Sequence, residues 1–372
     1  MDNPQNFTPP SSPTGSKPAA HLPNEILLQI LSYIPTDPAL QPTLAALCLT
    51  NTQWHTVTIA RLYAHPHIRG ANFDLFTRTI VPSINLHIKR SDLASLVHTL
   101  DLSHIVHHST KKTTARLLGR TKASLQVFVA PQTGFALNSY PALAHCARLR
   151  VLDLRLVCES VDFRDLGRAL AGLRALEVLF FPRTGVRDGA YDGADIRWPA
   201  LRELHLAGGL SGVFMAGLQG RCGGNLGMNP AGLPTTLTRL SVTNSPVLEC
   251  ASLVRFLAGV GGQLRVFTTC SLPRFRRGDL DDLLVFCPRL EKVSVAAEFW
   301  TGRAVAREEF RGLPAHSLSE LRVTKSEDSV HEDEITPVDI EVGIEYGFLG
   351  GLRRVVVNVA VGWVTNFRYH AG

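Results

Sequence analysis

One short pattern of apolar positions recurs along most of this chain. It consists of an apolar residue, two variable residues, a second apolar residue, one variable residue and usually a third apolar residue. Ten copies begin at Val97, Leu125, Leu149, Leu176, Leu201, Leu237, Leu264, Leu290, Leu318 and Leu352. The steps between copies run from 24 to 36 residues, with a mean of about 28. Chance does not explain ten copies at so regular a spacing, even in a chain that is 45% hydrophobic.

Each copy predicts one β-strand. Its last two apolar positions lie two residues apart, so on a strand both side chains point to one face and the variable residues point to the other. Between copies, apolar residues recur at helical spacing, as in Phe163, Leu166 and Leu170. A single strand-helix unit buries too little apolar surface to offset the entropy lost on ordering its backbone. The units are therefore expected to stack on one another.

A repeat of this length and motif resembles the leucine-rich repeat. The resemblance predicts an α/β solenoid, a leucine-rich-repeat horseshoe with a curved parallel sheet, over residues 96–372 in about ten repeats. The alternative is an ordinary α/β protein whose strands are similarly spaced. Cys146 and Cys287 both lie three residues before the first leucine of a copy, which predicts a packing role rather than metal ligation.

Residues 21–65 follow a different, helical pattern. Pro23 and Glu25 suit the first turn of a helix over Asn24–Ile34, where apolar residues recur at helical spacing. Pro35 is expected to end this helix, because proline cannot donate the next backbone hydrogen bond.

Two more short helices are predicted in the same segment, at Thr43–Leu49 and from about Asn51 to Tyr63. Three short helices form a bundle that is only marginally stable alone. Their apolar surface exceeds what one small core uses, which predicts a permanent partner for this segment.

Three stretches of this segment, LPNEILLQILSYI, LCLTNTQW and RLY, resemble the F-box. The resemblance covers about 45 of the 372 residues, and its order relative to the repeats is that of the F-box/leucine-rich-repeat substrate receptors, including many short fungal ones. In that family the F-box binds a Skp-type adaptor, which docks on a cullin that carries a RING subunit, and the repeats bind a protein substrate. The resemblance implies that this chain is a substrate-recognition subunit of an SCF-type E3 ubiquitin ligase.

The motif match also implies which residues face the adaptor: Leu22, Pro23, Glu25, Ile26, Leu27, Ile30, Leu31, Leu49 and Trp54. Two features depart from the family pattern. The linker between the first two helices, TDPALQPT, is a few residues longer than usual, and Gln53 stands where a basic residue is common. The alternative is a protein-binding scaffold whose F-box-like helices only cap the solenoid.

The variable strand positions predict where a substrate binds. On the concave face of such a sheet the expected contacts are Asp101, Asp153, Arg155, Phe180, Glu203, His205, Arg239, Lys292 and Arg322. Their mixed charge suits a protein surface better than a ligand of one sign, and an exposed aromatic side chain suits an interface anchor.

Composition and charge narrow the remaining function classes. The net charge of +6 and pI near 9 leave a nucleic-acid-binding solenoid as a third class, but the basic residues are scattered rather than clustered. The sequence contains no GxSxG, HExxH or phosphate-loop motif, so we expect no enzyme, metal site or cofactor. Seven cysteines without a CxxC pair predict an intracellular, reduced protein of the cytoplasm or nucleus.

The same pattern predicts how the chain is divided. Residues 1–20 are rich in proline and polar residues and are expected to form a disordered tail. The F-box is expected at residues 21–65, followed by a helical linker or N-terminal cap at 66–95 and then the repeats. Glycine-rich and acidic insertions lengthen two of the steps and are expected to be surface loops.

Overall fold

A computed structural model describes residues 22–35, 40–83, 91–106, 111–159, 161–183, 197–218, 233–325 and 334–363. The chain divides into two compact units, residues 1–62 and residues 63–372. The predicted disordered tail lies outside the described residues, as do half of the glycine-rich insertion and most of the acidic one.

The first unit is helical. Its helices are α1 (Asn24–Tyr33), α2 (Leu40–Cys48) and α3 (Thr52–Ala64), whose last two residues belong to the second unit. The predicted helices agree with these bounds to within three residues. Leu27, Leu31 and Leu44 are buried and form the small core of the unit.

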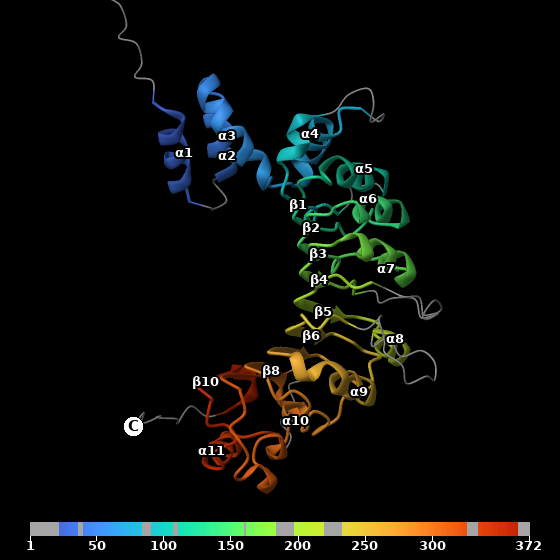
Figure 1. The fold of residues 1–372 in the computed structure, drawn as a ribbon, viewed down its shortest axis with the longest axis vertical. Coiled ribbons are helices and arrows are strands. Elements are labelled where there is room, and N and C mark those ends of the chain that lie inside the picture. Colours follow the sequence, from blue (N-terminus) through green and yellow to red (C-terminus); the bar gives the residue numbers. More distant parts are fainter. Residues whose placement is uncertain are drawn as a thin grey trace, which may run out of the picture. The chain divides into compact units, whose positions relative to one another are not determined.

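The second unit contains a ten-stranded parallel sheet within its described residues, and the strands follow sequence order (Figure 1). The strands are β1 (Thr99–Asp101), β2 (Val127–Val129), β3 (Val151–Asp153), β4 (Val178–Phe180), β5 (Glu203–Ala207), β6 (Arg239–Thr243), β7 (Val266–Cys270), β8 (Lys292–Ala296), β9 (Glu320–Thr324) and β10 (Arg354–Val357). Every strand begins two residues after the first residue of its repeat copy. A parallel sheet that adds one strand per repeat is a solenoid, so the predicted fold class is confirmed.

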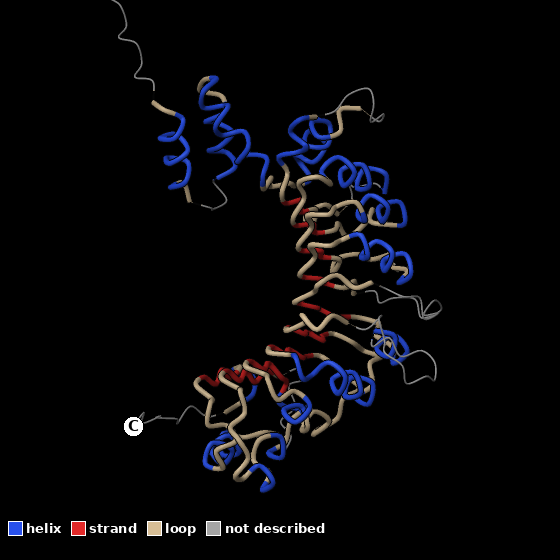
Figure 2. Tube along the Cα trace, in the orientation of Figure 1, coloured by secondary structure: helices blue, strands red, loops and turns tan. Residues whose placement is uncertain are grey.

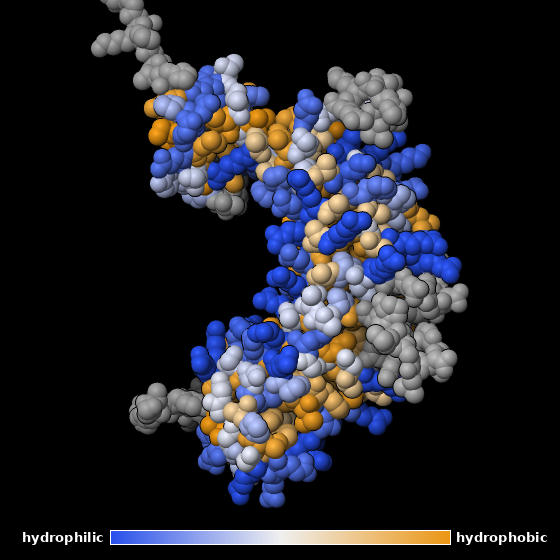
Figure 3. All heavy atoms as spheres, viewed as in Figure 1, coloured by the Kyte–Doolittle hydropathy of each residue, from blue (hydrophilic) through white to orange (hydrophobic). Residues whose placement is uncertain are grey.

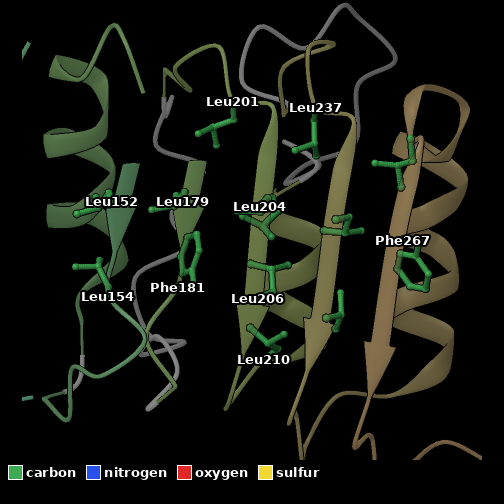
Figure 4. Close-up of a cluster of buried hydrophobic side chains, with 14 of the residues drawn as sticks. Leu152, Leu154, Leu179, Phe181, Leu201, Leu204, Leu206, Leu210, Leu237 and Phe267 are labelled. Carbon is green, nitrogen blue, oxygen red and sulfur yellow. The ribbon is translucent and has the colours of Figure 1, made fainter. Parts of the chain in front are cut away.

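The middle apolar position of each copy forms one continuous ladder across the sheet. The paired residues are Leu100, Phe128, Leu152, Leu179, Leu204, Leu240, Phe267, Val293, Leu321 and Val355. All of them except Val355, which lies on the last strand, are buried. Figure 4 shows part of this ladder, with Leu152, Leu179 and Leu204 side by side on neighbouring strands. Each repeat therefore buries its apolar positions against the next repeat.

Helices lie along one side of the sheet (Figure 2). The α-helices are α4 (Gly70–Ile80), α5 (Lys111–Thr121), α6 (Tyr140–Ala144), α7 (Phe163–Gly172), α8 (Gly212–Leu218), α9 (Cys250–Val260), α10 (Leu283–Phe286) and α11 (Pro337–Glu345). Short 3-10 helices are η1 (Asp92–Leu96), η2 (Leu137–Ser139), η4 (Gly261–Gln263), η5 (Ala297–Phe299), η6 (Gly302–Ala304), η7 (Glu308–Phe310) and η8 (Val359–Val361).

The expectation of one α-helix per repeat does not hold everywhere. The connection from β8 to β9 contains only the short helices η5, η6 and η7, and most of the connection from β4 to β5 lies outside the described residues. Among the helices that the structure describes, none has both the length and the apolar character needed to cross a bilayer.

The two cysteines that share a repeat position are both fully buried. Burial raises the pKa of the Cys146 and Cys287 thiols to about 12. Neither forms a disulfide. They pack as small apolar side chains, as their common position predicts.

A buried histidine near the C-terminal end of the sheet links the fold to pH. The ring nitrogen Nδ1 of His316 accepts a hydrogen bond from the Leu318 backbone N–H at 3.1 Å, so Nε2 carries the proton and donates to the Cys287 carbonyl at 3.1 Å. Burial lowers the pKa of His316, although its bonds to the backbone at Cys287 and Leu284 oppose this. Protonation at Nδ1 would break the bond from Leu318.

We expect this histidine to make the free energy of unfolding fall under mildly acidic conditions. Because the pKa of His316 is lower in the folded state, the unfolded chain binds the proton first. Stability is therefore greatest above pH 6.5, the usual histidine pKa, and declines as the pH falls from there through the folded-state pKa. The contribution should be about 1 kcal/mol, the net value of one hydrogen bond.

The measurement is urea denaturation at pH 7.5 and at pH 5 for the wild type and His316→Gln. Glutamine does not titrate, so the variant should lose less stability between the two pH values than the wild type. Equal losses would contradict the assignment. His65 and His205, whose pKa values are also lowered by burial, contribute equally to both proteins and cancel in the comparison.

Candidate functional site

Helix α1 carries an exposed apolar stripe. Leu22, just before the helix, and Ile26, Ile30 and Tyr33 on it recur at spacings of four, four and three residues, which places them on one helical face. Their exposed fractions are 42%, 41%, 40% and 76%. Figure 3 shows hydrophobic surface on this unit. We name these four residues the α1 stripe. Exposed apolar surface in one stripe on so small a unit is typical of a protein-binding site.

Side chains of α3 hold both ends of α1. Gln53 donates hydrogen bonds to the Leu22 carbonyl at 2.6 Å and to the Asn24 side chain at 3.0 Å. Two turns later, Arg61 donates to the carbonyls of Leu31 and Ile34, the latter at 3.2 Å. These carbonyls are at the C-terminal end of α1, where a cation is favourable. The two helices therefore run in the same direction, and α3 fixes the orientation of the α1 stripe.

The predicted adaptor-facing residues separate into two groups. Leu22, Pro23, Glu25, Ile26, Ile30 and Leu49 are exposed, and Trp54 is half-buried. Leu49 follows α2 and is 87% exposed. Leu27 and Leu31 are only 1% and 2% exposed, because they point into the helical core. For these two residues the prediction is corrected: they support the surface and do not lie on it.

Sequence reasoning missed three contributors to this surface. Tyr33 belongs to the α1 stripe, and its position seven residues after Ile26 was a signal for that face. Gln53 and Arg61 position α1, but nothing in their local sequence points to a partner about 30 residues away. Gln53, noted above as a departure from the family pattern, has a structural role here.

The second candidate surface is the face of the sheet that points away from the helices, opposite the apolar ladder. Along each strand, buried residues alternate with exposed or half-buried ones, as the repeat predicts. The predicted substrate contacts lie on this face. We call it the concave face, after the geometry of the predicted horseshoe.

Six of the predicted residues form one connected group on β3 to β6. The guanidinium carbon of Arg155 lies 4.2 Å from the centre of the Phe180 ring, and that ring stacks on His205 with centres 4.0 Å apart at 16°. Arg155 also bonds the Asp153 carboxylate, at 2.7 Å from its Nη2. The group continues through the Glu203 carboxylate, which is 2.8 Å from His205 Nε2 and 3.6 Å from Arg239.

His205 is a neutral imidazole near pH 7. Burial lowers its pKa most, the Glu203 carboxylate opposes this, and the Arg155 cation adds to the lowering. Because Nε2 lies beside an acceptor, it carries the ring proton. Three planar side chains from neighbouring strands therefore form a fixed stack, which we name the Arg155 stack.

Two of the predicted contacts have roles other than the expected one. Asp153 is only 6% exposed, because Arg155 covers it. It orients Arg155 and does not present its carboxylate to a partner. Asp101 accepts a bond from the Ser103 backbone N–H at 2.9 Å and shapes the end of β1.

The remaining predicted contacts lie on β8 and β9. Lys292 and Arg322 share one carboxylate, that of Glu320, at 3.0 Å and 3.8 Å. The hydrogen bond from Lys292 lowers the pKa of Glu320. Both cations are more than half exposed, so these pairs contribute little stability and both remain accessible to an anionic group. Within the described ranges, no three potential metal ligands gather into a site.

Comparison with known proteins identifies the N-terminal segment. The model of the F-box-like family matches residues 19–69, a range that contains α1, α2, α3 and the α1 stripe.

Two curated relatives align with most of the chain. The F-box protein YDR306C of Saccharomyces cerevisiae is 27% identical over 314 residues, which are 83% of this chain and 62% of the relative. Protein pof5 of Schizosaccharomyces pombe is 25% identical over 307 residues, 81% of this chain and 80% of the relative. The alignment thus spans less than two thirds of the length of the Saccharomyces protein.

Solved structures with a similar trace include two bacterial proteins. The leucine-rich-repeat protein LegL7 of Legionella pneumophila has a TM-score of 0.41 at 13% identity and covers 70% of this chain and 83% of its own. An internalin of Listeria monocytogenes has a TM-score of 0.37 at 12% identity and covers 84% of this chain and 98% of its own. The repeat architecture here is established by the ten-stranded sheet itself. The chain thus carries an F-box-like domain at its N-terminus, is similar to relatives that include a named F-box protein, and continues after that domain in a leucine-rich-repeat solenoid.

Proposed function

We propose that this chain is the substrate-recognition subunit of an SCF-type E3 ubiquitin ligase. In this proposal the first unit binds a Skp-type adaptor, and through it a cullin and a RING subunit, while the concave face binds a protein substrate. The observation that carries the proposal is the α1 stripe, an exposed apolar surface inside the segment that matches the F-box-like family.

Much of the apolar area of the α1 stripe remains in water. Fully burying a large apolar side chain contributes about 1.5–3 kcal/mol, and each of the four residues of the α1 stripe is still 40% or more exposed. An adaptor that covers them would gain most of this energy from a rigid surface, because α3 already fixes α1 at both ends. Leu49 and the half-buried Trp54 would extend the contact.

The concave face would supply the second binding surface. Its exposed charges and the Arg155 stack offer hydrogen bonds, ion pairs and planar groups, which are the contacts that protein interfaces use at their anchors. The proposal assigns binding and positioning to this chain and ubiquitin transfer to its partner subunits. No cofactor or metal is needed for that role.

The test is co-expression of residues 1–372 with a Skp-type adaptor, followed by size-exclusion chromatography. A stable one-to-one complex that also binds a cullin-RING pair would support the proposal. A folded chain that elutes without the adaptor would overturn it and favour the alternative, a binding scaffold whose helices have no ligase partner.

A further inference from the structure

The Arg155 stack follows the strand order of the sheet. Arg155 comes two residues after the end of β3, Phe180 ends β4, and His205 lies at the paired position on β5. Neighbouring strands are about 4.8 Å apart, which is close to the spacing of stacked planar groups. Consecutive strands therefore present consecutive members of one stack.

The stack is held in place before any partner arrives. Asp153 accepts bonds from Nε and Nη2 of Arg155, and Glu203 accepts one from His205. Phe180 is confined between the other two planar groups. A group that binds to this stack would meet side chains whose rotational freedom is already lost, which increases affinity.

The stack ends abruptly at β6. The residue paired with His205 on that strand is Ser241, and the next along the same row are Thr268 on β7 and Ser294 on β8. These side chains are short. None of the described residues places an aromatic ring against His205 on the side away from Phe180. The position above Ser241, one strand spacing beyond His205, is the next position of the stack.

We propose that this position binds an aromatic side chain from an extended segment of the protein substrate, which stacks on His205 and continues the Arg155 stack. This inference rests on the proposed function, because it assigns the substrate to the concave face. The imidazole of His205 already stacks on the Phe180 ring, and its other face offers the same kind of surface to a further aromatic ring.

Three cationic side chains near this position indicate which charge the ligand carries. Arg239 is beside the position, its side chain is 59% exposed, and among the described residues it pairs with Glu203 at 3.6 Å. Lys292 and Arg322 lie two and three strands further on, where they share the single carboxylate of Glu320. A guanidinium ligand would be repelled by Arg239, whereas a carboxylate would be attracted by all three cations.

The distance between β6 and β8 determines how far along the peptide the carboxylate lies from the aromatic residue. β6 and β8 are two strand spacings apart, about 10 Å, which an extended chain spans in about three residues. The ligand is therefore an extended peptide with an aromatic residue followed or preceded, about three positions away, by an aspartate or glutamate.

One substitution tests the position by filling it. Ser241→Phe adds a ring at the next place of the stack, where the protein's own phenylalanine should stack on His205 and exclude the ligand. The matched control is Val127→Phe, because Val127 lies on the same face of the sheet on β2, four strands from Ser241 and away from Lys292 and Arg322. Aromatic residues are favourable on exposed strands, so both variants should fold.

The probe is a display library of random linear peptides, panned against the full chain with its adaptor or alone. We expect the wild type to enrich peptides with an aromatic residue about three positions from an acidic one. A synthetic peptide of the enriched sequence should bind Ser241→Phe at least about tenfold more weakly and Val127→Phe with unchanged affinity.

Several results would overturn the inference. These are enrichment of peptides without an aromatic residue, no enrichment over an unrelated solenoid, or unchanged affinity in Ser241→Phe. If circular dichroism shows that Ser241→Phe is misfolded, His205→Ala decides instead, since removing the stacking surface should cause a similar loss. Adaptor binding is measured separately, so a chain that fails to bind peptides but binds the adaptor leaves the proposed function standing.

Discussion

Replacing Ile26 and Ile30 together by aspartate is expected to abolish co-purification with a Skp-type adaptor. Both side chains lie on the exposed face of α1 and are about 40% accessible. They are four residues apart, in the middle of the α1 stripe. Two carboxylates at the centre of an apolar interface would have to lose their water without a counter-charge, which costs several kcal/mol. That cost exceeds the free energy that burial of the two remaining stripe residues, Leu22 and Tyr33, can contribute.

The fold should survive this double substitution, because neither residue belongs to the helical core. The measurements are size-exclusion chromatography with the adaptor and far-ultraviolet circular dichroism of the chain alone. Leu27 is unsuitable for the same test. Its side chain is buried, so Leu27→Asp would unfold the unit and remove adaptor binding for an uninformative reason.

Leu28→Asp is the matched control. Leu28 is 53% exposed and lies on the same helix, but roughly 160° around the axis from Ile30 at the helical rotation per residue. The complex should form normally with this variant. If Leu28→Asp disrupts the complex as strongly as the double substitution does, the adaptor does not bind through the α1 stripe.

Gly208→Ala in the middle of the solenoid is expected to cause a large loss of stability. Gly208 follows β5 and has φ of +81°, a conformation that residues with a Cβ rarely adopt. A Cβ at this position would lie 1.6 Å from the Arg183 carbonyl oxygen of the preceding repeat. Both atoms are attached to backbone, so relief of the overlap requires the two repeats to separate. Together, strain and overlap should cost about 3 kcal/mol or more.

Gly119→Ala is the corresponding control, with an expected effect of opposite sign. Gly119 lies inside α5, and a Cβ there meets nothing within 4 Å. Alanine is favoured over glycine in a helix by about 0.5–1 kcal/mol, so this variant should be slightly more stable than the wild type. Urea denaturation followed by circular dichroism measures both. Equal midpoints for the two variants would contradict the close approach of Gly208 to Arg183.

The strands of this protein were predictable because their apolar positions are periodic. Each repeat must bury the same positions against its neighbours, so the requirement appears ten times in the sequence. The helices between strands were less predictable. The connection from β8 to β9 packs through short 3-10 helices instead of an α-helix, because only the strand is needed to extend the sheet.

The F-box-like helices were also predictable, but their two faces were not distinguishable in advance. Leu27, Leu28, Ile30 and Leu31 make α1 apolar over most of its circumference. Packing against α2 and α3 decides that Leu27 and Leu31 form the core and that Ile26 and Ile30 remain accessible. The motif therefore identified the segment, and burial separated its supporting residues from its exposed ones.

On the sheet, the Arg155 stack was likewise only partly predictable from the sequence. The repeat pattern placed Phe180 and His205 on the concave face, at paired positions on neighbouring strands. It carried no information that Arg155 would fold back over Phe180 or that Asp153 would be covered in the process. By itself the sequence determined the repeat, the strand positions and the two-part order of the chain, since these depend on local periodicity. Which apolar residues stay in water, and which planar side chains stack, was decided only by tertiary structure, because both depend on contacts between residues about 25 positions or more apart.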